Sequence, residues 1–70
     1  MGKNVKQTFN SNKVKACIAE KGITQTKLAK YLNISLATLN LKLNDKKDFK
    51  IGEIQAIAYY FKKDIGYFFD

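Results

Sequence analysis

Apolar residues near the carboxyl end recur at the spacing of one helix face, and this pattern constrains the fold more than any other feature. Its members fall on one side of a helix: Ile51, Ile54, Ile57, Ala58 and Phe61. The 70 residues include no proline and only four glycines, so few positions interrupt a helix. We therefore predict helices joined by short turns, with the 51–61 stripe as a core face rather than a cofactor site.

The first predicted helix is capped by Asn10 and stopped by Gly22. Its apolar positions lie about one turn apart: Val14, Cys17 and Ile18. Phe9 precedes the cap and is placed to pack on Val14. We expect Cys17 to be a small buried apolar residue rather than a reactive thiol.

Two short helices with a tight turn between them are predicted in the middle of the chain. Thr24 caps the first, over 25–32, and Ser35 caps the second. Asn33 tolerates the left-handed backbone that a tight turn needs. The inward face of the second helix is predicted from two leucines, Leu39 and Leu43.

Asn44 ends that helix, and Phe49 pins the charged loop that follows. Asp64 is placed to cap a last short turn that closes the core. The expected fold is an all-α, compact five-helix domain over 10–70, preceded by a flexible basic arm over 1–9. A chain of this size buries only about 60% of its unfolded surface on folding. Its stability is therefore expected to be marginal, and binding to a partner would add to it.

Thirteen lysines and six acidic residues, with no arginine, give a net charge of +7. Between Glu20 and Asp45 there is no acidic residue. Four lysines lie in that window: Lys21, Lys27, Lys30 and Lys42. A lysine-rich surface of this kind most often binds nucleic acid, and the alternative partners are a membrane surface or an acidic protein. The alternative is that the lysines only keep a small protein in solution.

The composition excludes several classes of protein. With no histidine and one cysteine, the chain lacks the ligands of a zinc site, a Ser-His or Cys-His catalytic pair and an internal disulfide. Its acidic residues show no obvious pair, so we expect no enzyme, cofactor or metal. The longest apolar run, 56–61, is six residues, against about 20 for a membrane span. We expect a soluble, cytoplasmic protein without membrane association.

The stretch QTKLAKYLNISLATL, residues 25–39, resembles the helix-turn-helix of the lambda-repressor-like family, which includes the Cro and Xre-type regulators. The resemblance covers 11–69, and 38–54 is similar to short phage regulators of Gram-positive bacteria. Two positions depart from the family pattern. Asn33 stands where glycine is usual, and Lys42 where many relatives are apolar, so Leu43 is expected to take that anchoring role.

The resemblance implies that helices 2 and 3 form the helix-turn-helix, with the third helix in the DNA major groove. Its outward residues then meet base edges, while Gln25, Lys27 and the helix amino termini meet phosphates. The expected DNA-binding residues are Gln25, Thr26, Lys27, Ser35, Leu36, Ala37, Thr38, Asn40, Leu41 and Lys42. Some relatives carry a basic arm in the minor groove, a role open to Lys3 and Lys6.

Without arginine, the commonest contact to guanine is missing. Asn40 suits adenine, and Leu36, Ala37 and Leu41 suit thymine methyl groups, so we expect A·T-rich sites. The first hypothesis is that the protein is a phage-type, Cro-like repressor that occupies operator DNA. If it is phage-encoded, it would act in the host cytoplasm. The alternative is an antirepressor whose apolar helix binds a second phage repressor protein.

Selective DNA binding favours a homodimer on DNA, because one helix-turn-helix buries too little surface against the DNA to distinguish one sequence from another. Six of the nine aromatic residues lie in the last twelve positions. The candidate interface residues among them are Tyr59, Tyr60, Tyr67 and Phe69. The alternative is that most of these side chains fill the core.

Overall fold

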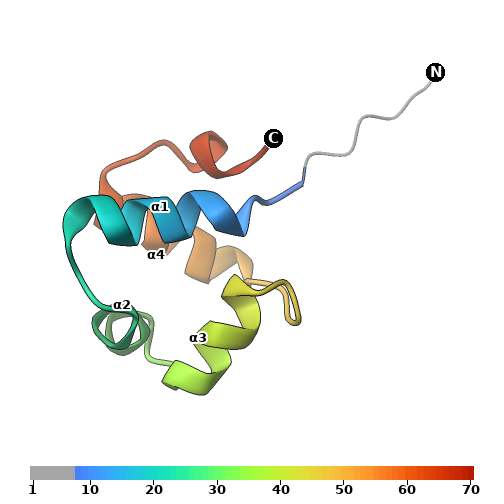
Figure 1. The fold of residues 1–70 in the computed structure, drawn as a ribbon. Coiled ribbons are helices and arrows are strands. Elements are labelled where there is room, and N and C mark those ends of the chain that lie inside the picture. The colour runs from blue at the N-terminus through green and yellow to red at the C-terminus, as the bar shows by residue number, and fades with distance from the viewer. Residues whose placement is uncertain (1–7) are drawn as a thin grey trace.

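The computed structural model describes residues 8–70, and this part of the chain is all-helical (Figure 1). Its elements are α1 (Ser11–Lys21), α2 (Gln25–Leu32), α3 (Leu36–Leu43), α4 (Ile51–Phe61) and the 3-10 helix η1 (Ile65–Phe68). The all-α class is therefore confirmed. The expected fifth helix is only a four-residue 3-10 helix, and the Asp64 side chain makes no capping hydrogen bond to it.

Local capping explains where three of the helices begin and end. Asn10, Thr24 and Ser35 each accept a hydrogen bond from a backbone N–H two or three residues later, at 3.0 to 3.1 Å. Gly22 and Asn33 follow α1 and α2 in the left-handed conformation, with φ of 72° and 60°. The predicted caps and stops are thus confirmed for these helices.

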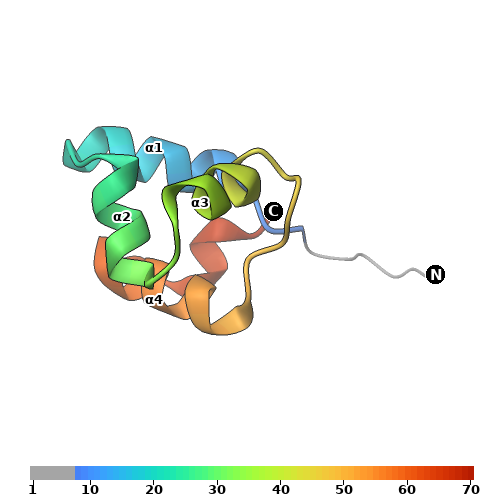
Figure 2. The same cartoon turned by 90° about the horizontal axis from the view of Figure 1, so that it is seen from below.

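The core lies between α1, α3 and α4, and α2 packs against α3 and α4 (Figures 1 and 2). Buried apolar side chains from every element form one cluster: Val14, Cys17, Ile18, Leu28, Ala29, Leu39, Leu43, Ile57, Ala58, Phe61 and Phe68. The predicted stripe on α4 is correct from Ile54 onward and wrong at Ile51, which is 66% exposed. Ile51 is the first residue of α4.

The carboxyl end pairs with the residues that precede α1. Phe9 forms an isolated antiparallel bridge with Phe69, and the Thr8 carbonyl accepts a hydrogen bond from the Asp70 N–H at 3.0 Å. The Phe9 ring lies 5.1 Å from the ring of Phe49. Residues 8 and 9, which the sequence placed in the predicted arm, thus pair with the carboxyl end of the domain. The predicted roles of Lys3 and Lys6 lie outside the described residues.

Candidate nucleic-acid interface

Four backbone and side-chain interactions fix the turn between α2 and α3. The Asn33 N–H donates to the Lys30 carbonyl at 3.1 Å, and the Ile34 N–H donates to the Ala29 carbonyl at 3.0 Å. Ile34 also packs against the core, and Ser35 then caps α3. The two helices are therefore held at a fixed angle, as a helix-turn-helix requires (Figure 2).

One face of α3 is covered and the other is open. Leu39 and Leu43 are buried, whereas Leu36 is 41% and Leu41 is 43% exposed. Ala37 and Asn40 are also exposed on this helix. The four residues expected to face outward thus form one accessible surface, with a single amide among three apolar side chains. That surface can offer one bidentate hydrogen-bonding group and several methyl groups to a partner.

The amino terminus of α2 is accessible to an anion. Thr26 and Lys27 are exposed, and Gln25 is half-buried. The first N–H groups of a helix have no partner within the helix, and its dipole favours negative charge there. A phosphate at this point would meet N–H groups and the Lys27 ammonium together.

At the start of α3, Ser35 and Thr38 are already engaged with each other. The Ser35 hydroxyl donates to the Thr38 hydroxyl at 2.9 Å and accepts from the Thr38 N–H at 3.0 Å. Ser35 is exposed and Thr38 half-buried. Both residues therefore serve mainly to cap the helix. A hydrogen bond from either hydroxyl to a phosphate would have to form without breaking the bonds between Ser35 and Thr38.

Lys42, which was expected among the residues that contact DNA, is buried and ion-paired within the domain. Its side chain is 5% exposed, and its ammonium forms an ion pair with the Glu53 carboxylate at 2.5 Å. The physical reason is its spacing, because position 42 lies three residues after Leu39 and shares the inward face of α3. Leu43 anchors the helix beside it, as expected.

Glu53 is the partner that the sequence analysis missed. One carboxylate oxygen accepts both from Lys42 and from the Lys50 backbone N–H, the latter at 2.8 Å. Burial alone would raise the pKa of Glu53, but these hydrogen bonds and the nearby lysine charges hold it below its ordinary value. A readable signal existed, because a Glu three residues after a helix cap is half of a capping box.

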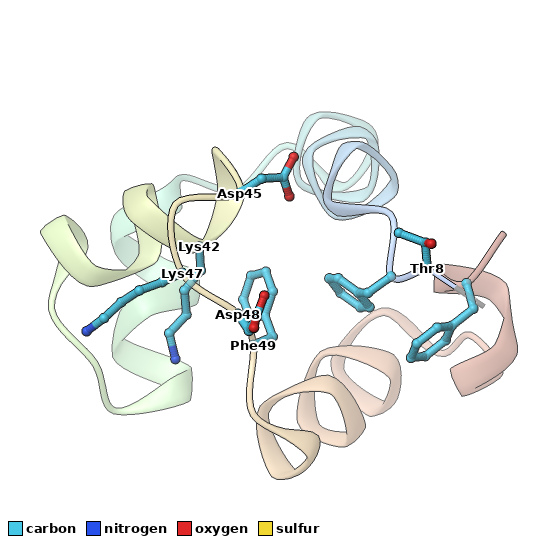
Figure 3. A pocket seen from close by; sticks show the side chains of 8 residues that line it. Thr8, Lys42, Asp45, Lys47, Asp48 and Phe49 are labelled. Carbon is cyan, nitrogen blue, oxygen red and sulfur yellow. The ribbon is translucent and has the colours of Figure 1, made fainter. Parts of the chain in front are cut away.

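A cavity of about 520 Å³ lies beside the loop that follows α3 (Figure 3). Its apolar walls come from Phe9, Phe49 and Phe69. Its charged groups have both signs: Lys42, Asp45, Lys47 and Asp48. Because its charges are mixed, this cavity has no preference for an anion or a cation. Its lining brings Phe69, near the carboxyl end, next to the α3–α4 loop.

The aromatic residues near the carboxyl end divide between core and surface. Phe61 and Phe68 are buried, so the core alternative holds for these two. Tyr59 is 81% exposed and Tyr67 is also exposed, whereas Tyr60 and Phe69 are half-buried. The structure thus leaves accessible aromatic surface on two elements, α4 and η1.

The fixed turn, the covered and open faces of α3 and the accessible start of α2 define a helix-turn-helix DNA-binding domain. A family model described as Cro/C1-type HTH DNA-binding domain matches residues 13–69, and the chain belongs to this family. Membership makes the protein a DNA-binding transcription regulator and points away from catalysis. A search of curated proteins found no significant match. Among residues 8–70, no helix has the length and apolarity to cross a membrane.

Proposed function

We propose that the protein is a phage-type, Cro-like repressor that occupies operator DNA with α3 in the major groove. The accessible face of α3 carries this proposal, because its outward residues come from a helix that the core and the turn hold rigidly. Occupying an operator blocks other proteins by steric exclusion and needs no second activity.

The outward face favours A·T-rich sites. The Asn40 amide can pair with adenine through one donor and one acceptor, and the methyl groups of Leu36 and Leu41 can pack on thymine. Lys42 is unavailable to guanine because its ammonium is paired inside the domain. With no arginine in the chain, guanine has no strong partner on this helix.

Phosphate contacts from α2 would set the register of α3 on the duplex. Lys27 supplies charge, while Gln25, Thr26 and the first N–H groups of α2 supply donors. Ser35 and Thr38 stand at the start of α3 and complete the expected contacts to the DNA backbone. These contacts orient the protein without reading sequence.

A second copy of the chain would provide the second half-site contact. Tyr67 and Phe69 are the best candidates for this interface, because Phe69 lines the cavity beside the α3–α4 loop and Tyr67 is exposed two residues before it. Charges of both signs lie at this end, where Lys13 pairs with Asp70 at 3.4 Å. Two copies can therefore meet here without facing like charge alone.

Selection of bound duplexes from a random DNA pool tests the proposal. The expected winners are A·T-rich and roughly palindromic, with half-sites about one helical turn apart. The same selection with Asn40→Ala should lose the preference at one position of each half-site. A G·C-rich consensus, or an unchanged consensus in the variant, would contradict the proposed readout.

The apolar character of α3 supports a second candidate, an antirepressor that docks this helix on a second phage repressor protein. Leu36 and Leu41 are each more than 40% exposed, and apolar anchors on a helix suit a groove on a protein. In the double variant Leu36→Ala/Leu41→Ala, loss of a repressor complex with DNA binding retained would favour this candidate. Loss of DNA binding would favour the repressor.

A further inference from the structure

A second accessible surface lies where the last turn of α2 meets the last turn of α4. A cavity of about 410 Å³ opens there, lined by Tyr31, Ala58, Tyr59, Tyr60, Lys62 and Lys63. We call it the tyrosine–lysine cleft. It shares no residue with the outward face of α3 or with the amino terminus of α2. The proposed DNA contacts therefore leave it without a function.

The aromatic wall of this cleft is held in place from within. The rings of Tyr31 and Tyr60 lie 4.6 Å apart at 49°, and Tyr60 also meets Phe61 edge-on at 5.1 Å. Phe61 belongs to the core. Tyr59 stands beside this wall and is 81% exposed, so most of its ring has no partner within the domain. A fixed aromatic wall with one free ring is a low-entropy surface for binding an apolar side chain.

The charged residues that line the cleft have one sign. Lys62 and Lys63 line it, and the Lys21 ammonium lies 5.8 Å from the centre of the Tyr60 ring. No carboxylate is among the lining residues. A second copy of the same surface would bring lysines against lysines, which costs free energy. Charge complementarity therefore favours an acidic occupant over self-association.

We propose that the tyrosine–lysine cleft binds an acidic peptide segment of another protein, with one apolar or aromatic side chain seated against Tyr31, Tyr59 and Tyr60. The cavity has the volume of an ordinary small-ligand site, enough for such an anchor. Acidic residues beside the anchor would pair with Lys62 and Lys63 at the rim. In this arrangement the tyrosine rings bury the anchor side chain, and the lysine ammonium groups select for acidic residues beside the anchor in the peptide.

Random twelve-residue peptides displayed on particles and selected on the full chain provide the test. Enriched peptides should combine aspartate or glutamate with one apolar anchor. As free synthetic peptides they should bind at least about tenfold more weakly to Tyr59→Ser and to Lys62→Glu. The matched control is Leu36→Ala/Leu41→Ala, which alters α3 and should bind these peptides as the wild type does. Circular dichroism should show that all three variants are folded, because the substituted side chains are exposed.

Several results would overturn the proposal. These are enrichment of peptides without acidic residues, affinity unchanged in both cleft variants, and binding lost in the α3 control instead. A sedimentation shift from dimer to monomer in Tyr59→Ser would assign the surface to a second copy. A loss of DNA affinity in Lys62→Glu as large as that in Lys27→Glu would assign it to DNA. The proposal does not depend on which operator the protein reads.

Discussion

The Lys42 ammonium of α3 and the Glu53 carboxylate of α4 form a buried ion pair that ties the two helices together. The side chains are 5% and 13% exposed. Because α3 is the helix proposed to enter the major groove, this pair fixes its carboxyl-terminal end relative to the rest of the domain. The Asp45 carboxylate, which accepts from the Ser11 hydroxyl at 2.9 Å, ties the next turn to α1.

Substitution of Lys42 by methionine should destabilise the domain by about 3 kcal/mol, because it leaves the Glu53 carboxylate buried without its cation. Urea unfolding followed by circular dichroism measures the change. The double variant Lys42→Met/Glu53→Gln is the control, since its amide oxygen still accepts from the Lys50 N–H. It should recover most of the loss. Equal destabilisation in the single and double variants would show that the two residues are not coupled.

The same pair makes stability depend on pH. The pKa of Glu53 is lower in the folded than in the unfolded chain, so its contribution is complete above its ordinary value of 4.5. That contribution is lost as the pH falls through the lower folded pKa. The difference in unfolding free energy between the wild type and Glu53→Gln should therefore shrink as the pH is lowered from neutral. A difference that stays constant down to about pH 2 would contradict the assignment.

Asn33 is predicted to carry backbone strain in the helix-turn-helix turn, at a φ of 60°. Asn33→Gly should stabilise the domain by about 0.5 kcal/mol, and Asn33→Ala should destabilise it by about 1 kcal/mol. Thermal and urea unfolding measure both. Lys62 has a φ of 57° at the end of α4, so Lys62→Gly is a matched control that should also raise the free energy of unfolding. A loss of stability in both glycine variants would argue against this account.

Asn40→Ala should weaken binding to the selected duplex by about 1–3 kcal/mol and leave binding to a scrambled duplex nearly unchanged. The reason is that its amide contacts base edges rather than phosphates in the proposed complex. Asn12→Ala, which removes an exposed amide from α1, is the control and should leave both affinities unchanged. Fluorescence anisotropy of labelled duplexes measures both. Equal weakening on the two duplexes would show that Asn40 does not read sequence.

Lys27→Gln should weaken binding to every duplex by a similar factor and reduce the slope of log affinity against log salt by about 1. The side chain is exposed at the start of α2, where the proposed complex has a phosphate. Lys62→Gln serves as a comparison, because Lys62 is exposed in the tyrosine–lysine cleft, away from the proposed DNA contacts, and should release no counterion. An unchanged slope in Lys27→Gln would remove this residue from the DNA contacts.

Local chemistry made most of the fold predictable from the sequence. Thr24, Asn33 and Ser35 mark the ends of α2 and α3 because capping depends on residues only two or three positions apart. The outward face of α3 followed from the burial of Leu39 and Leu43 on the opposite side. Neither feature depends on which helices meet.

Contacts between distant segments explain what the sequence did not reveal. Lysine is rarely buried, so Lys42 was expected at the surface, and its partner Glu53 comes from a different helix. Thr8 and Phe9 were assigned to the arm because residues 1–9 are polar and basic without a helical period, and their partners, residues 69 and 70, lie at the other end of the sequence. Periodicity placed Ile51 on the core face, but it cannot show where the neighbouring elements end.

The most direct test of sequence-specific DNA binding is the affinity of the wild-type chain for its selected duplex and for a scrambled duplex at two salt concentrations. Counterion release weakens both complexes as salt rises, whereas base contacts by α3 remain. We expect the selected duplex to keep an advantage of about a thousandfold at the higher salt. Affinities that fall together to the same value would show that the lysines hold DNA without reading it.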